Sequence, residues 1–240
     1  MPGSIKHIVA GGCSQSADGI GGVPPNPSNI TGGCSFTNAD QIRSPASWVS
    51  CLARDLDVDS LCNTAAHSHG NTLMSNSIID VLTKYPYSNQ DTLVLFNLTF
   101  ISRLDIACDF DHFDRSNNVP WDHTVLPHTY LKQKSQTLQK FYEHIGLPQV
   151  KVQSQRAIAS LFDFLQRRKF CYRFLLADTA IFDDVDWQTF LASNQENLVQ
   201  LGSQVGIRNF ILHHDLTIDK THPTLQGHTR IAKIVLDSLA

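Results

Sequence analysis

The chain has 240 residues, a hydrophobic fraction of 42%, a charged fraction of 17% and a formal net charge of −3. This composition is typical of a globular protein with a buried core, and it excludes an intrinsically disordered chain. No run of lysine and arginine points to nucleic acid or an anionic membrane as a partner. No apolar run approaches the ~20 residues of a membrane-spanning helix, and no apolar signal-peptide core follows Met1, so we expect synthesis in a cytoplasm.

Strand-like and helix-like segments alternate along the chain. The predicted strands lie at residues 5–10, 58–63, 92–98 and 171–177, with a further short strand at 209–212. The predicted helices lie at residues 45–55, 72–84, 128–144, 153–168, 187–202 and 224–239. A long loop is expected at residues 18–44, and Ser44-Pro45 is the expected start of the first helix. The alternation predicts one α/β domain over residues 1–240, with a parallel sheet of about five strands covered by helices on both faces.

The six cysteines include no C-x-x-C pair, which argues against a zinc ribbon or a thioredoxin-type motif. We favour reduced thiols, and a Cys34–Cys51 bridge is the alternative. The acidic stretch at residues 109–114 lacks the glycine and the distal glutamate of an EF-hand loop. The histidine pairs at residues 67/69 and 213/214 fit no zinc-binding pattern. The sequence therefore predicts neither a metal site nor a cofactor.

Three polar stretches follow predicted strands, at the edge where parallel sheets bind ligands. Gly11-Gly12-Cys13-Ser14 comes directly after the first strand, and its glycines allow a sharp turn that exposes a serine hydroxyl. Residues 63–71 follow the second strand. Asp219-Lys220-Thr221-His222 precedes the last helix, and its spacing allows the carboxylate to hold one imidazole nitrogen while the other faces a serine.

Taken together, these blocks resemble the SGNH (GDSL-type) hydrolase superfamily, whose members carry G-x-S after the first strand and D-x-x-H-P before the last helix. The resemblance spans essentially the whole chain. It implies a three-layer α/β/α, flavodoxin-like fold and a catalytic triad of Ser14, His222 and Asp219. It also implies an oxyanion site formed by backbone N–H groups of Ser14 and of the Ser68–Gly70 loop.

The middle blocks depart from the family pattern. The family commonly has G-x-N-D in its third block, whereas this chain has Asn97 two residues early and Thr99 at the corresponding position. Either side chain is a candidate oxyanion donor, and we favour Asn97. The usual glycine of the second block is Ser68 here, with Gly70 two residues later. A backbone donor tolerates such a change, because it supplies an N–H group and no particular side chain.

Ser35 is the alternative nucleophile, because Gly33-Cys34-Ser35-Phe36-Thr37 repeats the G-C-S motif of residues 12–14. With Ser47-Trp48 downstream, this segment resembles the nucleophile block of some viral and bacterial members of the family. That resemblance suggests a viral or phage-associated, virion-linked protein. We favour Ser14, because it ends a clear strand and a sharp turn after a strand is what exposes a nucleophile.

The resulting hypothesis is a serine esterase that hydrolyses small acyl esters through an acyl-enzyme without a cofactor. The polar loops around Trp121, His123 and His128 favour an O-acetyl ester on a carbohydrate, so the expected partner is a small ester or acetylated glycan. The alternatives are a lipase or thioesterase of the same superfamily, a non-catalytic glycan-binding module that kept the fold, and a metal-dependent hydrolase.

Overall fold

A computed structural model describes residues 4–13, 15–16, 35–38, 47–65, 69–100, 103–106, 123–125, 136–178 and 185–239. The main strands are β1 (His7–Gly11), β2 (Ser35–Asn38), β3 (Ser60–Asn63), β4 (Thr92–Leu98) and β7 (Cys171–Leu176). The helices are α1 (Trp48–Asp55), α2 (Asn71–Lys84), α4 (Gln136–Arg168), α5 (Val185–Ala192), α6 (Ile207–His213) and α7 (Leu225–Asp237), with a 3-10 turn η3 (Gln195–Asn197). A separate two-stranded sheet pairs β5 (Leu104–Ile106) with β6 (His123–Val125).

The five main strands form one sheet in the order β2-β3-β1-β4-β7. Strands β3, β1, β4 and β7 are parallel to one another, and β2 lies antiparallel to β3 at one edge. Numbered in chain order, the parallel strands follow the spatial order 2-1-3-4, which is that of the flavodoxin-like doubly wound sheet. The topological switch point therefore lies between β1 and β4, and ligands bind at such points beyond the carboxyl ends of the strands.

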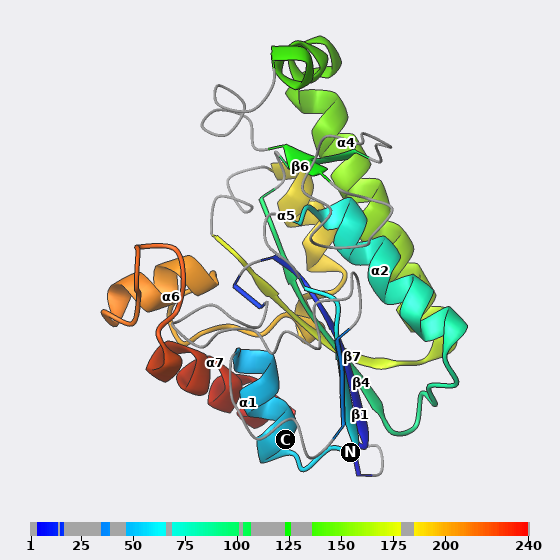
Figure 1. The fold of residues 1–240 in the computed structure, drawn as a ribbon, viewed down its shortest axis with the longest axis vertical. Helices are drawn as coiled ribbons and strands as arrows, with labels where there is room; N and C mark the ends of the chain where they lie inside the picture. Colours follow the sequence, from blue (N-terminus) through cyan, green and yellow to red (C-terminus); the bar gives the residue numbers. More distant parts are fainter. Residues whose placement is uncertain are drawn as a thin grey trace.

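Two apolar cores cover the two faces of the sheet. Along β4, Leu93 and Leu95 face the core formed with α1, α6 and α7, whereas Val94 and Phe96 face the core formed with α2, α4 and α5. This alternation follows from the two-residue period of a strand, and every residue of β4 is buried, as expected for a central parallel strand. Figure 1 shows α1 and α7 on one side of the sheet and α2 and α4 on the other. The predicted α/β/α arrangement is confirmed.

The four main predicted strands are confirmed, but the short strand predicted at residues 209–212 is wrong. The fifth strand is instead β2, which lies in the region predicted as a loop and is antiparallel, so four of the five strands are parallel. These residues belong to α6, whose buried Ile207, Phe210 and Ile211 have the i, i+3, i+4 spacing of an amphipathic helix. Beyond β7, Leu198 and Gly206 form isolated parallel bridges to Phe174 and Leu176. The chain between them therefore lies along the sheet edge where the fifth strand was expected.

The helix predicted at residues 187–202 is too long, since α5 ends at Ala192. Asn194 is buried, and its side-chain oxygen accepts hydrogen bonds from the Tyr172 hydroxyl at 2.7 Å and the Gln166 amide at 3.0 Å. These long-range contacts favour a break in the helix.

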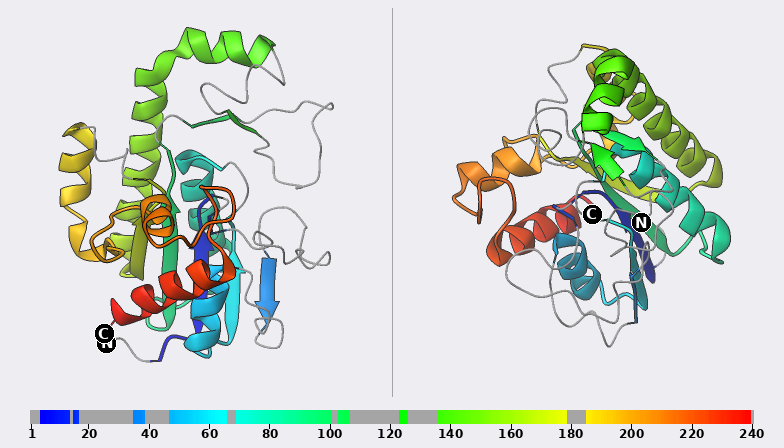
Figure 2. Two further views of the ribbon diagram at one scale, coloured as in Figure 1. Left: turned by 90° about the vertical axis from the view of Figure 1, so that its left-hand side faces the viewer. Right: turned by 45° about the horizontal axis from the view of Figure 1, so that its top comes forward.

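The two helices predicted around Gly146 form the two arms of α4, which is kinked at this glycine (φ 76°, ψ 154°). Figure 2 shows the amino-terminal arm of α4 projecting past the sheet.

Of the helices in the described ranges, none is both long and apolar enough to cross a bilayer. Ser47 caps helix α1, because its hydroxyl accepts a hydrogen bond from the Ser50 N–H. The cap therefore lies three residues after the predicted one, Ser44. Ser44, Pro45, residues 128–135 and both Cys34 and Cys108 lie outside the described residues.

Candidate active site

The turn after β1 lies at the topological switch point and is fixed by one buried side chain from β4. The Asn97 side-chain oxygen accepts from the Ser16 hydroxyl at 2.6 Å and from the Cys13 N–H at 3.2 Å. Its amide nitrogen donates to the Cys13 sulfur at 3.3 Å. Gly12 has φ +144°, and a Cβ atom at this position would lie 1.8 Å from the Asn97 oxygen, so only glycine fits here.

Further hydrogen bonds join this turn to α1 and β3. The Trp48 indole N–H donates to the Ser16 hydroxyl oxygen at 2.9 Å, and Trp48 is fully buried. The Asn63 amide donates to the Ser16 carbonyl at 3.0 Å. Cys13 and Ser16 are therefore held from three elements. Ser14, the predicted nucleophile, lies outside the described residues, but its chain neighbours Cys13 and Gln15 lie in this fixed turn.

The loop before α7 has the geometry expected of an acid–base pair. His222 Nδ1 lies 2.7 Å from Asp219 Oδ2. Asp219 Oδ1 accepts from the Thr221 hydroxyl at 2.7 Å and from the backbone N–H groups of Thr221 and His222 at 3.0 and 2.9 Å. These bonds orient the carboxylate toward the imidazole. With Nδ1 held by Asp219, the role of proton acceptor falls to Nε2.

The same hydrogen bonds favour the ionised form of Asp219. Burial raises the pKa of its carboxyl, but the bonds from the Thr221 hydroxyl, the His222 ring and two backbone N–H groups outweigh burial and hold this pKa well below its usual range. Asp219 is therefore ionised at neutral pH. An ionised carboxylate at Nδ1 keeps the proton on that nitrogen and stabilises an imidazolium when one forms.

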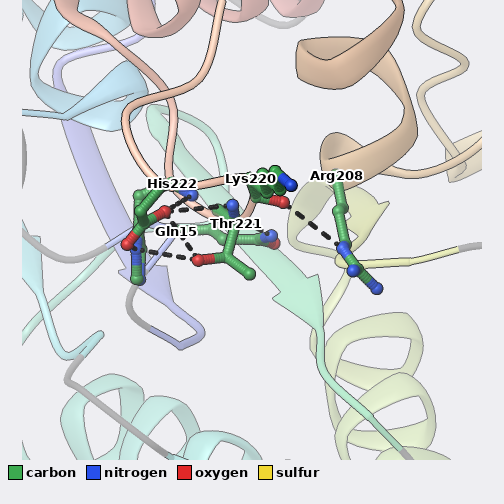
Figure 3. A network of polar contacts seen from close by, with 6 residues as sticks. Gln15, Arg208, Lys220, Thr221 and His222 are labelled. Carbon is green, nitrogen blue, oxygen red and sulfur yellow. Dashed lines mark hydrogen bonds and ion pairs between the residues drawn. The ribbon is translucent and has the colours of Figure 1, made fainter.

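The turn after β1 and the acid–base loop are joined directly, as Figure 3 shows. The buried Gln15 amide donates to the Thr221 carbonyl at 3.1 Å. On the other side of the loop, Arg208 Nε donates to the Lys220 carbonyl at 3.4 Å, and its Nη1 lies 3.0 Å from Asp178 at the end of β7. These contacts bring Gln15, the chain neighbour of the predicted nucleophile, and Thr221, the chain neighbour of His222, into one small region.

The other predicted substrate-binding residues are placed as follows. The Gly70 N–H donates to Asp105 at 2.8 Å, and Asp105 also accepts from the Leu73 N–H at 2.8 Å, which caps α2. Thr99 is fully buried beyond β4, and its N–H donates to the Asn71 side chain at 2.9 Å. Ser68 lies outside the described residues.

Two of the expected oxyanion donors therefore do not fit that role as they are arranged. The Asn97 amide is buried and bound to the turn after β1, and the Gly70 N–H is bound to a carboxylate. Asn97 instead holds the segment that carries Ser14. Ser35 begins β2 directly opposite Asn63, so its backbone also lies at the carboxyl edge of the parallel strands.

Sequence reasoning missed the supporting residues Ser16, Trp48, Arg208 and His228. His228 is 1% exposed, and its Nδ1 accepts from the Trp48 N–H at 3.1 Å. Burial, and to a lesser degree the nearby His222, lowers the pKa of His228 to about 4, so this ring is neutral. Its position six residues after His222, on the buried face of a predicted amphipathic helix, was the one available signal. In the part of the chain that the structure describes, no three His, Cys, Asp or Glu side chains gather to hold a metal ion.

Comparison with known proteins gives a likeness in structure alone. No protein-family model matches the sequence, and no curated protein is similar to it in sequence. A member of the lipolytic protein G-D-S-L family from Veillonella parvula aligns with a TM-score of 0.50 and 10% identity, over 97% of each chain. The YXIM protein of Bacillus subtilis aligns with a TM-score of 0.53 and 10% identity, over all of this chain and 57% of its own. The chain therefore has the GDSL/SGNH-like α/β/α fold.

Proposed function

We propose that the protein is a serine esterase of the SGNH/GDSL type, with Ser14 as nucleophile, His222 as general base and Asp219 as the orienting acid. One observation carries this proposal. An ionised Asp219 holds His222 Nδ1 at 2.7 Å, in a loop that the Gln15–Thr221 hydrogen bond joins to the turn that carries Ser14. The arrangement lies at the switch point of a doubly wound sheet, where the ligand site is expected.

The reaction follows from these roles. The Ser14 hydroxyl oxygen attacks the ester carbonyl carbon while His222 Nε2 takes its proton, and a tetrahedral oxyanion forms. The C–O bond to the alcohol then breaks, and the leaving alkoxide receives the proton from the imidazolium. A water molecule attacks the acyl-enzyme and passes its proton to Nε2. The bond between the acyl carbon and the Ser14 oxygen then breaks, the imidazolium returns its proton to that oxygen, and the acid is released.

The oxyanion needs N–H donors at the position where its charge develops. Because Gly70 and Asn97 are engaged within the protein, we assign this role to the backbone N–H groups of Ser14 and Ser68. For the substrate we propose an O-acetyl ester on a carbohydrate, on the basis of the polar, aromatic residues at positions 121–128. An acetyl group requires little apolar wall, whereas each further methylene gains its ~0.8 kcal/mol only against apolar surface.

Turnover of 4-nitrophenyl acetate by Ser14→Ala, Ser35→Ala and the parent protein tests the mechanism. We expect Ser14→Ala to lose activity by several orders of magnitude and Ser35→Ala to retain most of it. The reverse ranking would move the nucleophile to Ser35. A fluorophosphonate probe followed by peptide mass spectrometry identifies the labelled serine independently.

The alternatives give different outcomes in the same assays. Activity that EDTA abolishes and that survives loss of both serines would indicate a metal-dependent hydrolase. Binding of acetylated glycans without turnover would indicate a glycan-binding module. Faster hydrolysis of octanoate than of acetate esters would favour a lipase or thioesterase over an acetylesterase.

A further inference from the structure

Arg103 is a buried charge without a carboxylate partner among the described residues. The residue is 9% exposed and follows β4 at the carboxyl edge of the sheet. Its Nη1 donates to the His69 carbonyl at 2.9 Å. Its Nε is buried and has no acceptor in the described ranges, where Nη2 also makes no hydrogen bond. Arginine is rarely buried in this way unless it is paired, because removing a cation from water carries a large cost.

The groups around Arg103 compensate its charge only in part. The Phe100 ring lies 5.0 Å from the guanidinium carbon, a cation–π contact worth about 0.5–2 kcal/mol. Asp105 is the nearest acid along the chain, but its two oxygens accept from the Gly70 and Leu73 N–H groups at the start of α2. No ion pair joins Arg103 to any acid within the described part of the chain.

The side of the guanidinium that has no acceptor among the described residues has a specific shape. Nε and Nη2 lie on one edge of the planar group, and their N–H bonds point in parallel. This edge matches the two oxygens of a carboxylate, and the paired hydrogen bonds are charge-assisted. The edge opposite, which contains Nη1, is already bound to His69. The arrangement therefore leaves Nε and Nη2 without an acceptor in the described ranges.

Arg103 also lies among the segments expected to contact substrate. Its hydrogen bond to His69 places it beside the loop that follows β3, which includes Ser68 and Gly70. Along the chain it comes four residues after Thr99, which follows β4 next to the switch point. An anion bound to Arg103 would lie at the same edge of the sheet as the proposed triad.

We propose that Arg103 recognises a carboxylate on the ester substrate, through the edge formed by Nε and Nη2. The inference rests on the proposed esterase function and narrows its substrate to acidic esters. The carboxylate becomes the counter-charge that Arg103 lacks within the described chain, and its binding is strengthened because the guanidinium is shielded from water. Arg103 thereby acts on specificity and takes no part in proton transfer.

Matched pairs of substrates that differ in one charge test this proposal. The first pair, 4-acetoxybenzoate and its methyl ester, places the carboxylate on the alcohol side. The second, mono-(4-nitrophenyl) succinate and 4-nitrophenyl butanoate, places it on the acyl side. For each pair we compare the ratio of kcat/KM values in the parent protein, Arg103→Gln and Arg103→Lys. Arg54→Gln is the control, because Arg54 is a surface residue paired with Asp55.

We expect at least one pair to show a preference for the anionic ester, which Arg103→Gln reduces by tenfold or more through KM. Arg103→Lys should retain part of the preference, because it keeps the charge but loses the fork. Arg54→Gln should leave activity on both the anionic and the neutral esters unchanged. Equal ratios in the parent protein and Arg103→Gln would overturn the proposal, as would a parent protein that prefers the neutral ester in both pairs.

Calorimetric titration with benzoate and succinate separates this proposal from the proposed function. Binding that Arg103→Gln and Arg103→Lys weaken, in a protein that hydrolyses no ester, would support the anion site and refute the esterase. Hydrolysis of neutral esters without any anion preference or binding would refute the anion site alone. If Arg103→Gln fails to fold by circular dichroism, Arg103→Lys and the parent titration still decide the outcome.

Discussion

Replacing Gly12 with alanine tests the turn on which the whole site depends. The new Cβ atom would lie 1.8 Å from the Asn97 side-chain oxygen and 3.2 Å from the Ser16 hydroxyl. Asn97 must therefore move, and it loses hydrogen bonds to the Ser16 hydroxyl, the Cys13 N–H and the Cys13 sulfur. The backbone at φ +144° is also one that L-residues rarely adopt.

These losses set the expected magnitude. Three hydrogen bonds contribute about 0.5–1.5 kcal/mol each, and a non-glycine residue in a sparsely populated backbone region costs about 1–3 kcal/mol. We expect Gly12→Ala to lower the free energy of unfolding by about 3–6 kcal/mol, a large part of the ~5–15 kcal/mol of a typical domain. The esterase activity should fall as well, because Cys13 and Gln15 flank the proposed nucleophile.

Gly202→Ala is the matched control for this measurement. Gly202 also has a positive φ, +69°, but a Cβ atom there would meet nothing within 4 Å, so only the backbone cost of about 1–2 kcal/mol applies. Urea unfolding of both variants at low temperature gives the comparison. Removing the clashing side chain with Asn97→Ala should make the double variant less destabilised than the sum of the single variants. Equal stability of Gly12→Ala and Gly202→Ala would refute the reasoning.

Three further predictions concern the acid–base pair and its support. Asp219→Asn should lower kcat/KM by about 10²–10⁴-fold and move the acid limb of the pH–rate profile to lower pH, because the charge that stabilises the imidazolium is lost. Near-normal activity with an unshifted limb would contradict the role of Asp219 as the orienting acid. Trp48→Phe removes the N–H bond to Ser16 and leaves a cavity where the larger indole was buried, so it should cost about 2–3 kcal/mol in urea unfolding and lower kcat with little change in KM. The folded His228 takes up its proton only near pH 4, below the ordinary value of 6.5, so the unfolded state binds more protons between these values and stability must fall as pH is lowered through that window. The loss amounts to about 3 kcal/mol, and His228→Asn, which keeps an acceptor for the Trp48 N–H, should remove most of it in unfolding curves recorded from pH 4 to 7.

The sequence predicts the sheet well because the strand signal is local. Residues 93–96 and 98 are apolar, and such a run is typical of a strand that is buried on both faces. The wrong strand at residues 209–212 was also predicted from a local pattern. The segment Asn-Phe-Ile-Leu is too short for its periodicity to distinguish a strand from a helix. The end of α5 depends on contacts of Asn194 with Tyr172 and Gln166, which no local pattern contains.

The acid–base pair was predictable for a similar reason. The D-x-x-H spacing places both side chains on one turn, and the structure brings Asp219 Oδ2 and His222 Nδ1 to 2.7 Å. The role of Asn97 was not predictable from a motif alone. Its side-chain direction follows from the two-residue period of β4, which aligns it with Leu95 and places it on the face covered by α1. On that face it meets the turn after β1, whose position depends on the order of the strands.

The two loops of the site are each held in a conformation that they would not adopt alone. Gly12 has φ +144°, and Lys220, in the acid–base loop, has φ +68°, which costs a non-glycine residue about 1–2 kcal/mol. The peptide carbonyls of Lys220 and Thr221 are bound from opposite sides by Arg208 and Gln15. Such strain persists only where surrounding contacts determine the backbone, and those contacts come from β1, the end of β7 and α6. The relative position of the two loops is therefore set by the assembled sheet, which explains why the separate blocks of the sequence indicate chemistry only when they are taken together.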